Sequence, residues 1–143
     1  MVEARGLTGQ DTLAPFRALV VDDSAYARKC MAQVVTSLGG TVAGEAATGR
    51  QAVELYFALH PDLVLMDIAM PEMEGVEAVA AIINEDTSAR IIMVTSVVHQ
   101  EMVKRALGLG ARHFIAKPFD FHRAGEIVRF VLTQSAQGAG GQG

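Results

Sequence analysis

Five short strand-like runs alternate with five helical patterns along this chain, and this alternation constrains the fold more than any other feature of the sequence. The runs lie at residues 18–21, 41–46, 63–66, 90–94 and 113–116. Most of them are continuously apolar, which is typical of strands that are buried on both faces. Strands that alternate with helices in this way predict an α/β fold, with a parallel sheet covered by helices on both faces.

The segments between the runs carry apolar residues at three- and four-residue steps, which is the spacing of an amphipathic helix. Helices are predicted over residues 24–38, 48–59, 76–83, 99–109 and 120–133. Thr48 can cap the second of these helices, and His60-Pro61 ends it. The spacing also assigns inward faces to the third and the last helix, made by Val76, Val79, Ala80 and Ile83 and by Phe121, Ala124, Val128 and Val131.

The length of the chain, 143 residues, suits a single domain. We expect residues 15–134 to form this domain. Residues 1–14 show no sustained period and are expected to be a flexible N-terminal extension. Residues 135–143, with the sequence SAQGAGGQG, have the composition of a flexible glycine-rich tail.

Charge and composition argue against several classes of protein. The net charge is −4 and the Lys and Arg residues are scattered, so direct nucleic-acid binding is not expected. No apolar stretch reaches membrane-spanning length, so membrane insertion is not expected either. The single cysteine, Cys30, cannot form an internal disulfide. These features favour a soluble protein in a reducing compartment, and we expect a cytoplasmic location.

Polar side chains stand where four of the five predicted strands end. Asp22 and Asp23 follow the first strand, Asp67 the third, Thr95 the fourth and Lys117 the fifth. Each of these residues, taken alone, is most simply a cap, a turn residue or a loop charge. The carboxyl ends of parallel strands lie at one edge of a sheet, so neighbouring strands would bring these side chains into one crevice. Their convergence favours a functional site over five separate structural residues.

Three carboxylates at one edge of a sheet need a counter-ion. Two carboxylates about 5 Å apart repel each other by about 3 kcal/mol at an effective dielectric constant of about 20. Oxygen ligands without cysteine or clustered histidine favour Mg²⁺, with Mn²⁺ as the other candidate. Beside such an ion, the Asp67 carboxylate could attack a phosphoryl group, with Lys117 neutralising one phosphoryl oxygen and Thr95 donating to another.

Several motifs resemble those of receiver domains of bacterial two-component response regulators, in particular the stand-alone chemotaxis type. They span about residues 17–134, and they are LVVDDSAYARK, GEAATGRQAVEL, PDLVLMDIAMPEMEG, IIMVTS and FIAKPF. The resemblance implies a flavodoxin-like doubly wound (βα)5 fold, whose five-stranded parallel sheet has the order 2-1-3-4-5. It also implies a cis peptide bond between Lys117 and Pro118.

The resemblance implies roles for the acids as well. Asp67 matches the phosphoacceptor of the family. Asp23 and Asp67 would ligate Mg²⁺ directly, together with the backbone carbonyl of Ala69, and Asp22 would do so through a water molecule. Relatives often have a polar or charged residue in place of Ala69. Its methyl group cannot hydrogen-bond an attacking water, so the lifetime of the phosphoryl group stays open.

Three further residues match the signalling machinery of the family. Thr95 matches the switch hydroxyl, Phe114 the switch aromatic residue and Lys117 the phosphate-binding lysine. Phosphorylation of Asp67 would draw the Thr95 hydroxyl inward and let the ring of Phe114 rotate into the vacated space. The surface made by the fourth helix, the fifth strand and the fifth helix would change as a result.

The function implied by the resemblance is that of a single-domain response regulator, which is a signalling phosphoprotein rather than an enzyme, with intrinsic self-phosphorylation and self-dephosphorylation. A histidine kinase would be the phosphodonor, and a flagellar motor switch is the implied output partner. Two alternatives remain open, a phosphorelay carrier and the receiver fragment of a DNA-binding regulator. A haloacid-dehalogenase-like phosphatase is a rival from another class. It usually needs a second Asp two residues after the nucleophile, where this chain has Ala69.

Overall fold

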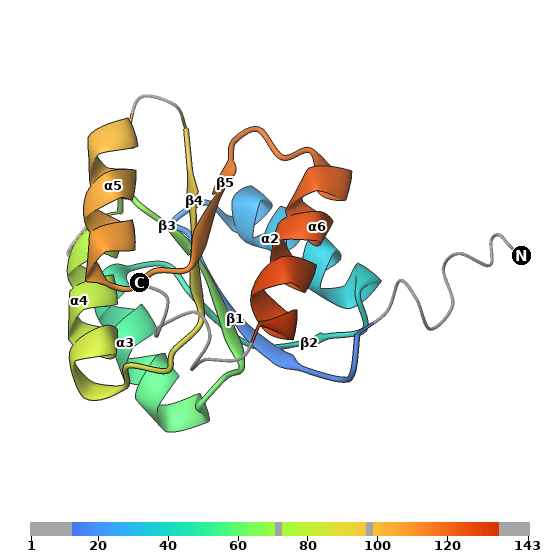
Figure 1. The fold of residues 1–143 in the computed structure, drawn as a ribbon, viewed down its shortest axis with the longest axis horizontal. Helices are drawn as coiled ribbons and strands as arrows, with labels where there is room; N and C mark the ends of the chain where they lie inside the picture. The colour runs from blue at the N-terminus through green and yellow to red at the C-terminus, as the bar shows by residue number, and fades with distance from the viewer. Residues whose placement is uncertain (1–12, 71–72, 97–98, 135–143) are drawn as a thin grey trace, which may run out of the picture.

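The computed structural model describes residues 13–70, 73–96 and 99–134. Strands and helices alternate through these residues, as the sequence predicts (Figure 1). The strands are β1 Arg17–Val21, β2 Thr41–Ala46, β3 Leu63–Asp67, β4 Ile91–Thr95 and β5 His113–Ala116. The helices are α2 Ala25–Ser37, α3 Gly49–Leu59, α4 Gly75–Glu85, α5 Gln100–Leu109 and α6 Phe121–Thr133. Each predicted boundary lies within two residues of the observed one.

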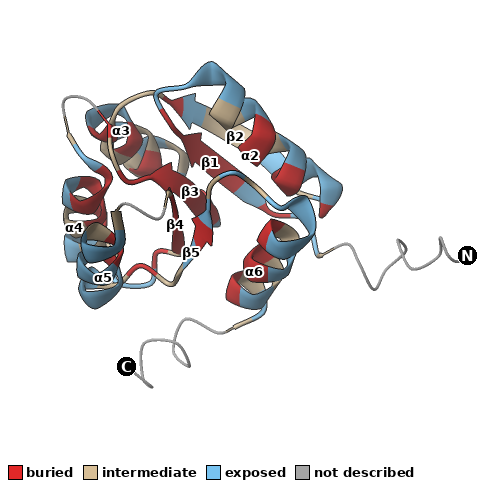
Figure 2. Cartoon of the chain, turned by 90° about the horizontal axis from the view of Figure 1, so that it is seen from above, coloured by how far each residue is buried: buried red, intermediate tan, exposed pale blue. Residues whose placement is uncertain are grey.

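The strands form one parallel sheet in the order β2-β1-β3-β4-β5. The α/β fold class and the strand order are therefore confirmed. Helices α2 and α6 cover one face of the sheet, and α3, α4 and α5 cover the other (Figure 2). Strand β3 lies in the middle of the sheet, and every residue in it is buried.

Alternation along the strands divides the core into two clusters. Leu63 and Leu65 of β3 pack with α2 and α6, whereas Val64 and Met66 pack with α3, α4 and α5. Successive side chains of a strand point to opposite faces, so a strand between two helical layers must be apolar at every position. The continuous apolar character of this strand therefore reflects the covering of both faces.

Three helices begin at side chains that accept hydrogen bonds from free backbone N–H groups. The Ser24 hydroxyl accepts from Ala27, the Thr48 hydroxyl from Gln51 and the Asp120 carboxylate from Arg123. These caps supply acceptors to N–H groups that have no partner inside the helix. The predicted cap at Thr48 is confirmed.

Three predicted inward positions, on two helices, need correction. Phe121 is 49% exposed, because it is the first residue of α6 and lies at the start of the helix. On α4, Ala80 and Ile83 are only partly buried, whereas Ala78 and Ile82 are fully buried. Helix α4 contacts both α3 and α5, so its buried stripe is wider than a single sheet-facing row and is turned relative to the predicted one.

Two of the expected segments fall mainly outside the described residues. These are the N-terminal extension 1–14, of which only residues 13 and 14 are described, and the tail 135–143. Within the described part of the chain, no helix combines the length and the apolar character needed to cross a membrane.

Candidate functional site

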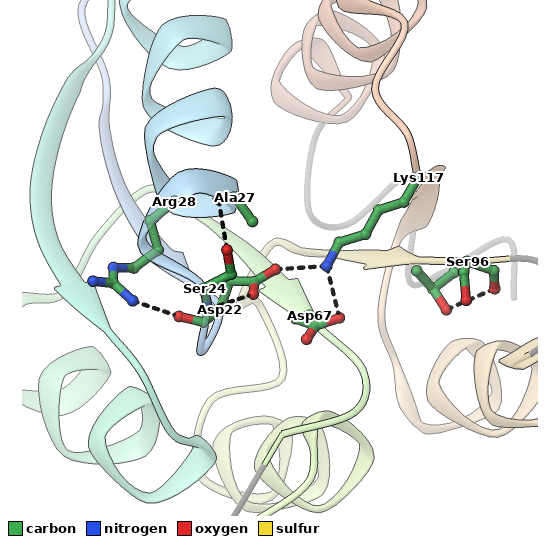
Figure 3. A network of polar contacts seen from close by, with 8 residues as sticks. Asp22, Ser24, Ala27, Arg28, Asp67, Ser96 and Lys117 are labelled. Atoms are coloured by element: carbon green, nitrogen blue, oxygen red, sulfur yellow. Dashed lines mark hydrogen bonds and ion pairs between the residues drawn. The ribbon is translucent and has the colours of Figure 1, made fainter.

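Four strands deliver the predicted site residues to the same edge of the sheet. Asp22 and Asp23 follow β1, Asp67 and Thr95 are the last residues of β3 and β4, and Lys117 follows β5. Strands β1, β3, β4 and β5 are consecutive neighbours in the sheet. The side chains of Asp22, Asp67 and Lys117 point toward one another in Figure 3. The convergence predicted from the strand ends is therefore present in the structure.

The three acids form a cluster that could hold a metal ion. One carboxylate oxygen from each of Asp22, Asp23 and Asp67 lies within 4.8 Å of the others. Asp22 and Asp67 are 1% and 7% exposed, whereas Asp23 is open to solvent. The ligands are all oxygen atoms, and they suit a hard divalent cation that keeps part of its water shell. Ala69, two residues beyond Asp67, packs partly against the core.

Lys117 supplies the positive charge of the site. Its Nζ lies 2.8 Å from Oδ2 of Asp22 and 3.4 Å from Oδ1 of Asp67. In the described part of the chain, no other lysine or arginine side chain forms an ion pair with these two acids. The peptide bond between Lys117 and Pro118 is cis, as the resemblance implies. One ammonium group therefore contacts two of the three carboxylates in the cluster.

The electrostatics of the site favour the neutral form of the Asp67 carboxyl group. Burial raises the pKa of Asp67 above its ordinary value, and the charge of Asp22 raises it further. Lys117 lowers it, but not enough to cancel the first two effects. For Lys117 itself, burial lowers the pKa, while the hydrogen bond to Asp22 and the charge of Asp67 raise it more. Lys117 therefore stays protonated, and the acids remain short of positive charge.

Hydrogen bonds hold the backbone of the turn that carries the acids. The Asp22 N–H donates to the carbonyl oxygen of Ala46 on β2 at 3.0 Å. The Asp22 carboxylate accepts from the Ser24 N–H at 2.9 Å. The Asp22 carbonyl accepts from Nη1 of Arg28 at 2.8 Å. Arg28, five residues after Asp23 and in the first turn of α2, was not among the predicted site residues.

The loop after β3 folds back closely over the end of that strand. The Gly75 N–H donates to the carbonyl oxygen of Ile68 at 2.7 Å. A Cβ atom at Gly75 would overlap the carbonyl oxygen of Asp67. Only a residue without a side chain leaves the end of β3 undisturbed here. The motif residues around Asp67 thus fix the position of its backbone.

Thr95 and Phe114 lie on the other side of Asp67 from the acid pair and border one pocket. Thr95 is 3% exposed, and its hydroxyl donates to the carbonyl oxygen of its neighbour Ser96 at 3.0 Å. Phe114 is 41% exposed, so its ring is turned outward. A pocket of about 280 Å³ lies between β4, α5 and β5 and is lined by Thr95, Ser96, Gln100, Val103, Lys104, Leu107, Phe114 and Ala116.

Comparisons with known proteins concern the family and the fold of the chain. The family model described as response regulator receiver domain matches residues 18–129. The chemotaxis protein CheY of Thermotoga maritima is 45% identical, over 80% of this chain and 96% of its own length. CheY of Bacillus subtilis is 44% identical, over 82% of this chain and 98% of its own length. In a crystal structure of a CheX-CheY-BeF3-Mg²⁺ complex from Borrelia burgdorferi, one chain matches with a TM-score of 0.79 and 36% identity, over 83% of this chain and 90% of that one.

Proposed function

The chain belongs to the response regulator receiver family, and from this premise we propose that Asp67 accepts a phosphoryl group from a histidine kinase in a Mg²⁺-dependent reaction. The observation that carries the proposal is the arrangement around Asp67. Its carboxylate lies at the end of the central strand, in a cluster with Asp22 and Asp23 and 3.4 Å from Lys117. The solved relative in complex with BeF3 and Mg²⁺ supports the same chemistry. We place this reaction in the cytoplasm.

The oxygen-only cluster fits Mg²⁺, with Mn²⁺ as a possible substitute. Asp23, Asp67 and the backbone carbonyl of Ala69 would be direct ligands, and Asp22 would bind through water. A bound Mg²⁺ would supply the charge neutralisation that lets an anionic carboxylate meet an anionic phosphoryl group. Asp22 and Asp67 are the acids that Lys117 already contacts, so metal and ammonium would share the same excess of negative charge.

The transfer step needs little beyond positioning and charge. A carboxylate oxygen of Asp67 attacks the phosphorus of a phosphohistidine, an O–P bond forms, and the N–P bond breaks. The imidazole leaves with the electron pair of that bond and takes up a proton. Lys117, which contacts Asp67 at 3.4 Å, neutralises an oxygen of the transferred phosphoryl group.

The signal would pass through Thr95 and Phe114. The Thr95 hydroxyl now donates to a neighbouring carbonyl group, and a phosphoryl group on Asp67 would offer it a stronger acceptor. The outward ring of Phe114 borders the pocket beside Thr95, into which it could turn. The surface formed by α5, β5 and α6 would change, and this surface would bind the output partner. Similarity to CheY favours a chemotaxis partner such as the flagellar motor switch.

The proposal is tested by incubating the protein with acetyl phosphate and Mg²⁺ and measuring the intact mass. Wild type should gain one phosphoryl group, and the gain should vanish with EDTA or in Asp67→Asn. Asp62→Asn is the matched control, because Asp62 lies at the opposite edge of the sheet and should not affect labelling. Equal labelling of Asp67→Asn and wild type would refute the assignment of the acceptor.

A further inference from the structure

The guanidinium of Arg28 joins the turn that carries the acids to the neighbouring strand. Its Nη1 donates to the backbone carbonyl of Asp22 at 2.8 Å, as Figure 3 shows. Its Nε donates to Oε1 of Glu45 on β2, also at 2.8 Å. The side chain of Arg28 is 20% exposed and that of Glu45 56% exposed. The contact to the carbonyl is thus the more protected part of this link.

Helix stability does not explain a cation in this place, and once a divalent ion occupies the site charge balance does not explain it either. Arg28 lies close after Ser24, the N-cap of α2, where the helix dipole is positive and a basic residue is disfavoured. A cation beside a divalent-ion site also opposes binding of that ion. The half-exposed pair with Glu45 offers little compensation, because surface ion pairs contribute little to stability. The hydrogen bond to the Asp22 carbonyl is therefore the contact that best explains an arginine at position 28.

That bond acts on Asp23 through the geometry of the peptide. The carbonyl of Asp22 and the N–H of Asp23 lie in one rigid plane, so fixing the oxygen fixes the direction in which the chain enters Asp23. The Asp22 N–H is held by Ala46 and its carboxylate by the Ser24 N–H. Asp23 is exposed, so packing does little to orient it.

We propose that Arg28 is a positioning residue: it locks the peptide plane between Asp22 and Asp23 and thereby aims the Asp23 carboxylate at the metal site. The proposal rests on the proposed function, because it takes Mg²⁺ as the ligand of the cluster. Groups that orient metal ligands from behind typically change metal affinity tenfold to a hundredfold when they are removed. Arg28 holds the backbone rather than a ligand atom, so we expect about a tenfold effect.

Mg²⁺ affinity, measured by isothermal titration calorimetry without phosphodonor, separates positioning from simple charge. Removing a nearby cation should tighten Mg²⁺ binding if charge alone matters, whereas loss of positioning should weaken it. Arg28→Gln should bind Mg²⁺ about tenfold more weakly than wild type. Lys29→Gln is the matched control, since it removes the same charge from the exposed neighbour on the same helix, and it should bind equally or slightly more tightly.

Two further variants grade the contact. Glu45→Gln keeps the bond from Arg28 to Asp22 and should weaken Mg²⁺ binding by less than about threefold, because only the support of the guanidinium is altered. Arg28→Lys keeps the charge but has no planar fork to reach the carbonyl and Glu45 together, so it should fall between wild type and Arg28→Gln. At saturating Mg²⁺, the phosphorylation rate of Arg28→Gln should return to within about twofold of wild type, because the defect is one of affinity.

The outcomes are separable. Affinity of Arg28→Gln equal to or tighter than that of Lys29→Gln overturns the proposal. Thermal unfolding in EDTA checks that each variant is folded. If Arg28→Gln does not fold, Arg28→Lys takes its place, and a Mg²⁺ affinity of Arg28→Lys equal to that of wild type overturns the proposal. Failure of wild type to bind Mg²⁺ overturns both this inference and the proposed function, whereas normal binding by wild type and Arg28→Gln overturns the inference alone.

Discussion

The two edges of the sheet carry the same kinds of side chain in opposite electrostatic conditions. At the carboxyl edge, Asp22, Asp23 and Asp67 crowd together, and one ammonium group contacts two of them, Asp22 and Asp67. At the amino edge, each acid has its own donors. Asp62 accepts from the Arg17 N–H at 2.8 Å, and Asp86 accepts from the Tyr56 hydroxyl at 2.7 Å.

The pKa shifts follow this difference. Burial and the charge of Asp22 raise the pKa of Asp67, whereas hydrogen bonds from Tyr56 and Ser88 lower the pKa of Asp86. Ionisation of Asp67 therefore costs stability, and ionisation of Asp86 adds to it. The donors at the amino edge stabilise the fold, whereas the carboxyl edge holds carboxylates whose negative charge is only partly balanced.

Loss of the ammonium should produce the largest change. Lys117→Gln leaves two buried acids without their counter-charge, and we expect a loss of about 2–3 kcal/mol in the free energy of unfolding in EDTA. This is less than for a fully buried pair, because the lysine side chain is 29% exposed. Urea denaturation measures the loss, and Mg²⁺ should restore part of it. Lys104→Gln, at a side chain that is 74% exposed, is the control. Equal stability of the two variants would mean that the acids do not depend on Lys117.

Crowding at the end of β3 should give the next effect. Gly75→Ala places a methyl group on the carbonyl oxygen of Asp67 and should lower the free energy of unfolding by about 2 kcal/mol. Gly108→Ala is the matched control, because a Cβ atom there meets nothing within 4 Å. It lies inside α5 and should instead stabilise by about 0.5–1 kcal/mol. Urea denaturation measures the free energy of unfolding of both variants. If Gly75→Ala is as stable as Gly108→Ala, the loop after β3 can shift at no cost.

A substitution at the amino edge should change the free energy of unfolding by less, and the change should depend on pH. Tyr56→Phe removes the hydroxyl that donates to Asp86 and should cost about 1 kcal/mol at pH 7. Because the pKa of Asp86 is lowered in the folded state, this contribution is present above the unfolded pKa and lost as pH falls through the folded one. Urea denaturation of both proteins between pH 7 and pH 3 should show the difference shrinking. A difference that is constant with pH would assign the cost to packing.

The smallest effect should have the opposite sign. Asp67→Asn removes a carboxylate whose pKa is raised, so in EDTA at pH 7 it should stabilise the protein, by less than about 1 kcal/mol. The difference should vanish as pH falls below the folded pKa of Asp67, because wild type then carries a neutral acid as well. With Mg²⁺ the order should reverse, since wild type gains from binding. Thermal unfolding in both buffers measures this, and destabilisation in EDTA would contradict the proposed crowding.

Most of the fold could be predicted from the sequence, because apolar runs and helical spacing are both local patterns. The apolar run at 63–66 and the helical spacing at 120–133 follow from burial on two faces or on one. The order of the strands came from the resemblance, because periodicity does not say which strands pair. Phe121 was wrongly assigned to the core, since spacing alone does not reveal where a helix first meets the sheet.

The site residues that stand at the ends of strands could be predicted from the sequence. Asp22, Asp67 and Lys117 were found because parallel strands bring their carboxyl ends together. Arg28 was missed because it acts through a backbone carbonyl, and an arginine in a helix gives no sign of which oxygen it reaches. The roles of the site residues, including the switch at Thr95 and Phe114, stay predictions until labelling and structural change are measured.

The separation of Lys117 from its acids along the chain sets an order of events during synthesis. The lysine follows Asp22 by 95 residues and Asp67 by 50. A ribosome that makes this protein therefore releases the acids well before their counter-charge. Asp22 and Asp67 lie close together only once β1 and β3 have paired, and from then until β5 is in place their repulsion must be offset by ions from solution. The site therefore acquires its own counter-charge only when β5 and the lysine after it join the sheet.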